Sequence, residues 1–541
     1  MVSLLTKKRI DKMKKKTALV SVSDKADLII LLKAFKKHDI EIISSGGTAE
    51  KIRKLGFEVK KVSQVTGVSE YPAGLVKTLH PKIHYAILFD RKKEDHVRRL
   101  KSENITPIDF VVCNLYPFEK TTKNTLDREK IISNIDIGGV AMIRAAAKNH
   151  KYVTVITTPK DYRKSAEELD QNNGHILPQT KEELALKAFK HTAEYDSMIS
   201  SYFEKENFPD KLTLSFDKKQ ELRYGENPHQ EASFYKKHDL EKQISFKKLQ
   251  GKELSYNNLN DLNGVVRILR DFMNHYESEK AVIISKHTNP CGIATSDNLY
   301  EAFTKAWDCD KISAFGSVIG ANSDIDKNTA ELIKSKFIEL IIAPGYEEAA
   351  LETLKEKKNL RLLEIKDIDA FKKIPEVDYQ FIDLGMLVQE RDTKTYDKLY
   401  LKSGNIDINQ VKELIRFGIL SIKNIKSNSI NIVREYRPGY FQMIGAGIGQ
   451  PNRVIAVELA IKKAITNLKH EFNNKYKEKI KDLILVSDAF FPFDDSIKLS
   501  AKYGIKTVVE PGGSIRDKEV IETSEKIGIN LIFTGMRHFR H

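Results

Sequence analysis

Residues 17–50 read TALVSVSDKADLIILLKAFKKHDIEIISSGGTAE, and this stretch decides the fold class. An apolar run at 17–22 precedes an amphipathic stretch at 27–38, and a second apolar run at 41–45 precedes another amphipathic stretch at 49–55. Short apolar runs that alternate with helical periodicity are typical of parallel strands joined by helices. The stretch therefore predicts a doubly wound α/β domain.

The same alternation returns further along, with strands predicted at 110–114 and 152–156 and helices at 140–149 and 182–202. The segment that follows loses its helical period and gains turn residues, which places a domain boundary near residue 210. The predicted domains are therefore 1–210 and 211–541.

The C-terminal region contains two similar apolar strands, AVIISK (281–286) and LILVSD (483–488). Each runs into a polar, proline-bearing loop and then a helix, which suggests a divergent internal duplication without a fixed-period repeat. A second boundary near residue 395 is expected, which gives lobes of about 211–395 and 396–541.

Composition narrows the class of protein. No apolar run in the 541 residues approaches the roughly 20 needed to cross a bilayer, and the N-terminus lacks the apolar core of a secretory signal. Three cysteines cannot build a disulfide framework, so a cytoplasmic location is expected. The net charge of +15 fits nucleic acid, small polyanionic substrates or simply solvated lysine-rich helices, and we favour the last because no nucleic-acid module is recognisable.

Two loops in the first domain have the composition of a phosphate cradle. SVSDK (21–25) and SSGGT (44–48) each follow a predicted strand and precede a helix, where backbone N–H groups point toward a ligand. Paired glycines also serve ordinary tight turns. Two such loops with a lysine and hydroxyls nevertheless favour a phosphate site, with candidate residues Ser21, Ser23, Lys25, Ser45, Gly46, Gly47 and Thr48.

Charged side chains elsewhere in this domain suit acid–base chemistry. VKTLHPKIH (76–84) is predicted to be a proline-broken loop that carries Lys77 and Thr78, and it is either a solvated loop or a cover for the phosphate site. IDIGG (135–139) places Asp136 at a helix start, and AAAKN places Lys148 at the far end of that helix. If the loop covers the site, these groups supply charge and proton transfer.

In the second domain SKHTNPCG (285–292) follows a strand, and its adjacent lysine and histidine suit a general base beside a cation that polarises an electrophile. A zinc deaminase would need H-x-E and P-C-x-x-C, and neither is present around His287 and Cys291. Catalytic zinc is therefore not expected, and Cys291 is interpreted as a packed or turn residue.

Six further runs could each be an ordinary turn, but they occur together in one chain. They are RYGENPHQ (223–230), ISAFG (312–316), IIAPGYEE (341–348), SNS (427–429), GAGIGQPNR (445–453) and SDAFFPFDD (487–495).

Taken together, these runs closely resemble the bifunctional phosphoribosylaminoimidazolecarboxamide (AICAR) formyltransferase and inosine monophosphate (IMP) cyclohydrolase family, over nearly the whole chain. The resemblance implies an α/β protein with a methylglyoxal-synthase-like N-terminal domain and a C-terminal transformylase region of two cytidine-deaminase-like lobes. It also implies a homodimer, small-molecule substrates with 10-formyltetrahydrofolate as co-substrate, no catalytic metal, and neither nucleic acid nor membrane as partner.

The resemblance also assigns roles. His287 manages the proton in formyl transfer, Lys286 stabilises the oxyanion, and Asn428 orients the formyl group. Lys77, Asp136 and Lys148 are the catalytic residues of the cyclohydrolase. The phosphate-cradle residues named above match substrate-binding positions of the family. Further positions match as well: Thr78, Ile137, Gly138, Arg223, Tyr224, Phe315, Gly316, Glu339, Arg453, Phe490 and Asp495.

One position departs from the family pattern. The family usually has arginine two residues before Lys77, and this chain has Leu75, which removes a bidentate phosphate contact. Tyr85 and Ala86 also replace glycines common after the histidine of this loop. A transformylase whose N-terminal domain only binds nucleotide is therefore one rival hypothesis, and a nucleic-acid-binding protein with steeply salt-dependent affinity is another.

Overall fold

The structure is a computed structural model that describes residues 15–69, 76–238 and 244–541. It consists of two compact units. Unit 1 runs to Phe216 and takes in Lys237 and His238, while unit 2 holds Asp217–Lys236 and the described residues from 244 onward. No helix in the described ranges is both long enough and apolar enough to cross a membrane.

Unit 1 is built on a five-stranded sheet in the order β3-β2-β1-β4-β5, and every neighbouring pair is parallel. The order reverses at β1, as in doubly wound folds. Its strands are β1 (Thr17–Val22), β2 (Glu41–Ser44), β3 (Lys60–Lys61), β4 (Phe110–Asn114) and β5 (Thr154–Ile156). Its α-helices are α2 (Leu28–Lys37), α3 (Gly46–Lys54), α4 (Val62–Thr66), α5 (Pro81–Leu88), α6 (Glu94–Ser102), α7 (Phe118–Asn124), α8 (Arg128–Ser133), α9 (Gly138–Lys148), α10 (Tyr162–Gln171) and α11 (Pro178–Phe203), with a 3₁₀ turn at Pro159–Asp161.

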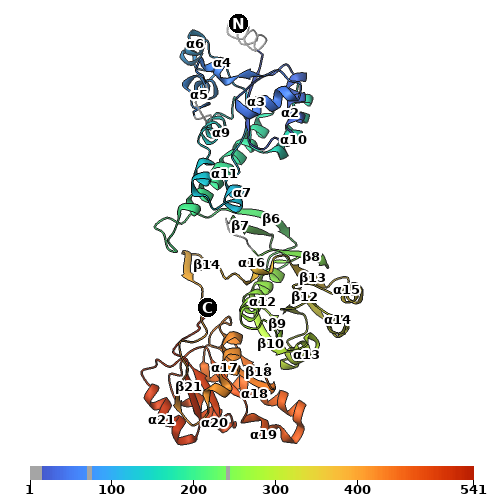
Figure 1. Cartoon of the computed structure of the whole chain (residues 1–541), viewed down its shortest axis with the longest axis vertical. Helices are drawn as coiled ribbons and strands as arrows, with labels where there is room; N and C mark the ends of the chain where they lie inside the picture. Colours follow the sequence, from blue (N-terminus) through green and yellow to red (C-terminus); the bar gives the residue numbers. More distant parts are fainter. Residues whose placement is uncertain (1–14, 70–75, 239–243) are drawn as a thin grey trace. The chain divides into compact units, whose positions relative to one another are not determined.

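Helices cover both faces of this sheet, as Figure 1 shows for α2 and α10 on one side and α5, α9 and α11 on the other. Strand β1 is buried on both faces, because Leu19 packs with one core and Ala18 and Val20 pack with the other. This is why its sequence reads as a continuous apolar run. The predicted strand at 17–22 is confirmed, as are those at 110–114 and, with shorter ends, 41–45 and 152–156.

Two expected loops of unit 1 are partly helical. Helix α3 begins at Gly46 rather than near Ala49, so the glycines of SSGGT form its first turn. The loop predicted at 76–84 ends at His80, whose Nδ1 accepts a hydrogen bond from the N–H of Lys82 and caps α5. Proline at the first helical position explains the error, because its fixed φ suits a helix start.

Unit 2 contains a twelve-stranded sheet in the order β16-β21-β20-β19-β17-β18-β10-β9-β11-β12-β13-β8. Its strands are β8 (Phe246–Gln250), β9 (Lys280–Lys286), β10 (Asn289–Ser296), β11 (Ser317–Ala321), β12 (Ile338–Ala343), β13 (Arg361–Ile365), β16 (Tyr400–Ser403), β17 (Ile430–Arg437), β18 (Tyr440–Gly447), β19 (Ile484–Ser487), β20 (Thr507–Glu510) and β21 (Asn530–Phe533). Its α-helices are α12 (Tyr256–His275), α13 (Leu299–Cys309), α14 (Lys327–Lys334), α15 (Glu348–Lys355), α16 (Ile368–Lys372), α17 (Ile408–Ile422), α18 (Arg453–Phe472), α19 (Tyr476–Ile480), α20 (Asp495–Lys502) and α21 (Asp517–Ile527), with a 3₁₀ turn at Asn473–Lys475. Two small hairpins accompany the sheet: β6 (Phe216–Leu222) with β7 (Ala232–Lys237), and β14 (Val377–Ile382) with β15 (Gly385–Glu390).

The large sheet consists of two copies of one fold, which we name half 1 (residues 246–365) and half 2 (residues 400–533). From the seam at β10 and β18 outward, half 1 has the order β10-β9-β11-β12-β13-β8 and half 2 has β18-β17-β19-β20-β21-β16. Each half starts with an edge strand, a helix and an antiparallel hairpin. Each hairpin also carries a bulge at the same place, next to the pairs Ile284↔Gly292 and Ile432↔Gly445. The expected duplication is therefore present in the topology.

Hydrogen bonds establish which residues correspond. In half 1 the N–H of Ala281 donates to Asn322 Oδ1 (2.7 Å), and the N–H of Asn322 donates back to Ala281 O (3.2 Å). In half 2 Ser429 and Asp488 exchange the same two bonds, at 3.0 and 3.2 Å. AVIISK therefore corresponds to β17 and not to LILVSD, which is the counterpart of β11. The sequence pairing was wrong because both segments are buried apolar strands of similar length.

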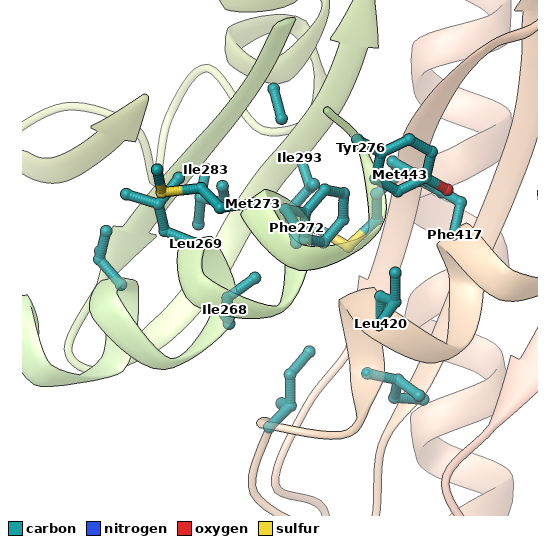
Figure 2. Close-up of a cluster of buried hydrophobic side chains, with 14 of the residues drawn as sticks. Ile268, Leu269, Phe272, Met273, Tyr276, Ile283, Ile293, Phe417, Leu420 and Met443 are labelled. Carbon is teal, nitrogen blue, oxygen red and sulfur yellow. The ribbon is translucent and has the colours of Figure 1, made fainter. Parts of the chain in front are cut away.

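The halves share one hydrophobic core at the seam. Figure 2 shows Phe272 of α12 and Tyr276, the residue that follows this helix, facing Phe417 of α17, with Met443 of β18 beside them. The rings of Phe272 and Phe417 lie edge to face, with centroids 5.6 Å apart. Because α12 and α17 are equivalent helices of the two copies, this core joins the halves into one unit.

A close helix–strand approach in each half leaves no room for a side chain. A Cβ on Gly292 would lie 1.9 Å from Ala306 O of α13, and one on Gly445 would lie 2.3 Å from Ala460 O of α18. We expect Gly292→Ala to lower the free energy of unfolding of unit 2 by about 3 kcal/mol, the upper end of the usual cost of overpacking, because backbone must move. Urea denaturation measures this loss. Gly47→Ala, whose Cβ would meet nothing within 4 Å, serves as control, and equal stability of both variants would contradict the packing argument.

Candidate active sites

Site 1 lies at the carboxyl edge of the parallel sheet in unit 1, where β1, β2 and β4 end. Thr48 ties the first two strands together, because it accepts the N–H of Val22 (3.2 Å) and donates to Val22 O (3.0 Å). Asn114 at the end of β4 accepts the N–H groups of Ser23 (2.6 Å) and Asp24 (2.9 Å). These bonds hold the SVSDK loop in place, with Ser21 and Lys25 at its two ends.

Two helix N-termini meet the segment that carries Lys77 and Thr78. A Cβ on Gly46, at the start of α3, would lie 2.7 Å from Lys77 Nζ, and one on Gly138, at the start of α9, would lie 2.9 Å from Thr78 Oγ1. The residue at the start of α3 makes no side-chain cap bond, whereas the first turn of α9 gives the N–H of Gly139 to Asp136. The segment lies against the starts of both helices, which favours the covering arrangement of the two that the sequence left open. The uncapped N-terminus of α3 beside a lysine makes a favourable environment for an anion.

Asp136 is the acid–base candidate in site 1. The structure places it directly before α9, where its Oδ1 accepts the N–H of Gly139 at 2.7 Å. Its own N–H donates to the hydroxyl of Tyr195 at 2.9 Å, which fixes the backbone at that point. Burial raises the pKa of the Asp136 carboxyl, and the N–H of Gly139 opposes that shift. A raised carboxyl pKa brings the group closer to the range in which it exchanges protons at neutral pH.

Lys148 does not join this cluster. It is the last residue of α9, ten residues beyond Gly138, and at 1.5 Å per residue the two ends are about 15 Å apart. Its side chain is exposed. The structure places Lys77 at the start of α3, and Thr78, Asp136 and exposed Ile137 at the start of α9. The catalytic roles of Lys77, Asp136 and Lys148 stay predictions from the family. Leu75 lies outside the described residues.

Site 2 begins at the hairpin turn between β9 and β10. His287 and Thr288 occupy the turn with φ of 52° and 65°, a two-residue geometry that twists with the flanking strands but is strained for residues other than glycine. Asp261 of α12 accepts the N–H of Thr288 at 2.8 Å. The preceding Lys286 donates from Nζ to Phe315 O at 2.7 Å, so its ammonium lies beside the ISAFG segment.

A cavity of about 230 Å³ opens beside this turn, and both halves line it. Half 1 contributes Lys286 and His287, and half 2 contributes Ile448 and Lys463 among others. Cys291 also borders the cavity, but burial raises the pKa of its thiol to about 12. The thiol is therefore neutral at physiological pH, as expected for a packed residue rather than a nucleophile.

A second group of candidates surrounds the start of β12 and β13. Arg223 donates to the Tyr224 hydroxyl at 2.7 Å and lies over its ring. Glu339 is paired with Arg361 at 3.0 Å, a buried arginine that sequence reasoning missed. Phe315 is exposed and packs on Phe337, next to Gly316, with ring centroids 4.8 Å apart. An exposed ring beside charged groups suits a planar, anionic ligand.

The half 2 candidates form a buried ionic cluster. The guanidinium of Arg453 pairs with Asp488 Oδ1 at 2.5 Å and donates to Asn428 Oδ1 at 2.6 Å. Asn428 Nδ2 in turn donates to Gln450 O at 2.8 Å, and the side chain of Gln450 donates to Ile448 O beside the cavity. Asn428 is therefore linked to the cavity through Gln450, whose side chain binds the carbonyl of the cavity-lining Ile448. Arg453 is buried and donates to Asn428, and its expected place in a ligand site stays a prediction.

The remaining candidates lie in the loop after β19. Phe490 is partly buried, and Asp495 is exposed at the start of α20. The neighbouring Phe491 donates its N–H to Glu510 Oε2 at 2.6 Å. Glu510 is fully buried and its Oε1 has no hydrogen-bond partner among the described residues. This carboxyl therefore holds the backbone of the loop after β19 in place through Phe491.

Replacing Glu510 by glutamine should reveal its protonation. Burial raises the pKa of Glu510 to about 8, opposed by the N–H of Phe491. Above the pKa of the unfolded chain, near 4.5, folding must keep this carboxyl protonated, so the stability of the wild type declines between about pH 4.5 and 8, by up to about 1.4 kcal/mol per pH unit. Glutamine is neutral at every pH. We therefore expect the stability of Glu510→Gln, measured by urea denaturation, to rise relative to that of the wild type as the pH increases across that range. A constant difference between pH 5 and 8 would show that Glu510 is ionised.

Known proteins match the chain along its length. Residues 146–463 match the family described as AICARFT/IMPCHase bienzyme, and residues 27–141 match the MGS-like domain. The chain is 43% identical over 537 residues to the "Bifunctional purine biosynthesis protein PurH" of Acetivibrio thermocellus, across 97% of this chain and 100% of that protein. This chain belongs to the AICARFT/IMPCHase bienzyme family.

A further relative agrees with this assignment. A protein of Persephonella marina with the same description is 44% identical over 533 residues, covering 97% of this chain and 99% of its own. A solved structure described as "Crystal structure of ForH" is 29% identical and covers 35% of this chain and 100% of its own, with a TM-score of 0.33. Membership confirms the α/β fold with an MGS-like N-terminal domain and indicates small-molecule substrates and a formyl-folate co-substrate.

Proposed function

We propose that the protein transfers the formyl group of 10-formyltetrahydrofolate to AICAR and then cyclises the formylated product to IMP with loss of water. The observation that carries this proposal is the pairing of two clusters in a chain of this family. Site 1 offers two helix N-termini, Lys77 and Asp136, and site 2 offers Lys286 and His287 at a cavity lined by both halves.

Formyl transfer belongs to site 2. The 5-amino group of AICAR is a weak nucleophile because its lone pair is shared with the ring. As it attacks the formyl carbon, His287 accepts the amine proton and Lys286 stabilises the negative charge on the formyl oxygen. The bond from the formyl carbon to N10 then breaks, and tetrahydrofolate leaves with a proton on N10. Asn428 orients the formyl group and is itself held by Arg453.

Cyclisation belongs to site 1. The carboxamide nitrogen attacks the new formyl carbon, and the oxygen of that carbon leaves as water. The step is intramolecular, so it needs positioning and proton transfer above all. Lys77, Thr78 and the starts of α3 and α9 hold the phosphate, and Asp136 moves the proton.

The organisation of the protein is part of the proposal. We assign cyclisation to a domain of residues 1–210 and formyl transfer to 211–541, with lobes meeting near residue 395. We further propose a cytoplasmic homodimer that uses neither nucleic acid nor a catalytic metal. Sedimentation of the purified chain at several concentrations tests the dimer.

The direct test is incubation of the purified protein with AICAR and 10-formyltetrahydrofolate. Tetrahydrofolate is followed by absorbance, and nucleotides are separated by chromatography. Appearance of tetrahydrofolate and IMP supports both steps. Folded protein that forms no tetrahydrofolate refutes the proposal.

A second function is favoured by Leu75, which stands where the family usually has arginine. In that case the protein formylates AICAR but site 1 only binds the nucleotide. The same incubation separates the two functions, because the formylated intermediate then accumulates and forms IMP no faster than without enzyme.

A further inference from the structure

The turn that carries His287 is unstable on its own. Both of its residues are non-glycine and both have positive φ, a conformation that persists only where surrounding contacts impose it. Within the hairpin, the Thr288 hydroxyl and the Asn289 amide both donate to His287 O, at 2.6 and 2.9 Å. The N–H of Thr288 is satisfied from outside the hairpin, by Asp261 Oδ1 at 2.8 Å.

Helix α12 presses directly on this turn. Asp261 and Gly264 lie three residues apart on one face of the helix, and a Cβ on Gly264 would lie 2.9 Å from Thr288 O. The same face reaches Glu339, because Asn258, one turn earlier, donates to its Oε2 at 3.5 Å. This face of α12 therefore supports two candidate residues of site 2.

The helix is rigid enough for that task. A reciprocal pair between Ser255 and Asn258 caps its start, and its later turns pack into the core at the seam through Phe272. Asp261 also faces His287 electrostatically: burial raises the pKa of Asp261, while the N–H of Thr288 and the positive charge of His287 oppose that shift. The nearby Glu339 acts in the same direction as burial.

We propose that Asp261 is a positioning residue for formyl transfer, which holds the His287–Thr288 turn in its reactive geometry and faces the imidazolium that forms when His287 accepts the substrate proton. The inference rests on the proposed function of site 2. Asp261 does not touch substrate; it acts through the backbone of Thr288 and through the charge of His287. Such a carboxylate behind a base stabilises the protonated base and fixes its orientation.

The test compares Asp261→Ala with Asp261→Asn. We expect Asp261→Ala to lower kcat for formyl transfer by about 10- to 100-fold with KM for AICAR unchanged, because the base is displaced rather than the nucleotide released. Asparagine keeps an oxygen that can accept the Thr288 N–H, so it should recover at least about threefold over alanine and still fall short of wild type. Asn263→Ala, an exposed position on the same helix, is the matched control.

The outcomes separate the inference from the proposed function. If the wild type itself transfers no formyl group, the proposed function fails. If it does, wild-type kcat in Asp261→Ala overturns the positioning role, and equal losses in both variants overturn the role of the Thr288 bond. Imidazole signals in NMR, assigned with His287→Ala, should move in Asp261→Ala and not in Asn263→Ala. If Asp261→Ala does not fold, Gly264→Ala is measured in its place, because its Cβ would displace the His287–Thr288 turn at Thr288 O. An unchanged kcat in Gly264→Ala also overturns the inference.

Discussion

Replacing His287 by alanine is expected to slow formyl transfer by about 10²- to 10⁴-fold, the usual contribution of a positioned acid–base group. The side chain borders the cavity beside Lys286, and its backbone conformation is held by bonds from Thr288 and Asn289 that alanine leaves in place. The loss should therefore come from the missing imidazole. Steady-state release of tetrahydrofolate measures it.

Two controls accompany His287→Ala. His470 is exposed at the end of α18, so His470→Ala should keep wild-type turnover. Cyclisation of the formylated intermediate, supplied directly, should be unchanged in His287→Ala, since that step is assigned to unit 1. Near-normal formyl transfer in His287→Ala would remove this residue as the base.

The largest effect on stability is expected at Asp488. Asp488 is fully buried and pairs with Arg453, which is buried as well, so Asp488→Ala leaves a guanidinium without its counter-ion. Removing one partner of such a pair costs about 3–5 kcal/mol. We expect a loss of this size in urea denaturation, together with loss of formyl transfer because Arg453 no longer holds Asn428.

Half 1 supplies the matched control. At the equivalent positions it carries Leu299, the first residue of α13, and Asn322, which accepts the N–H of Ala281. The double variant Arg453→Leu with Asp488→Asn copies this neutral pair into half 2 and should restore most of the stability. Formyl transfer should stay low, because nothing then donates to Asn428 Oδ1. Restored activity in the double variant would show that Arg453 is not needed to orient Asn428.

Much of the fold was predictable from sequence because buried parallel strands read as apolar runs. The strand at 17–22 and the helix that follows it were found for this reason. The duplication was harder to interpret, since AVIISK resembles LILVSD in composition while its true counterpart, β17, begins with INIVRE. The strand order, the repeated bulge and the repeated hydrogen bonds at Ala281 and Ser429 establish which strands correspond.

The candidate sites were predictable where they form continuous motifs. Lys77 lies at the start of α3 and Asp136 at the start of α9, whereas Lys148 is separated from Asp136 by the length of α9. The supporting residues were missed, because Asp261 and Glu510 act from other elements. SYNNLNDLNG (255–264) offered a signal in retrospect, since Ser255, Asn258 and Asp261 recur every three positions on the face of α12 that is not exposed.

The repeated fold has an evolutionary consequence. A gene that carries the same fold twice holds two copies of each ligand-binding edge, and selection needs to preserve only one of each. In half 1 the hairpin turn keeps its lysine and histidine, while the corresponding turn of half 2 is closed by Arg437, which pairs with Asp297 and Glu301. At the opposite edge half 2 keeps its ionic cluster, while half 1 has a cavity of about 570 Å³. Under the proposed function each copy supplies a different edge to formyl transfer, so neither half alone carries both groups of side chains.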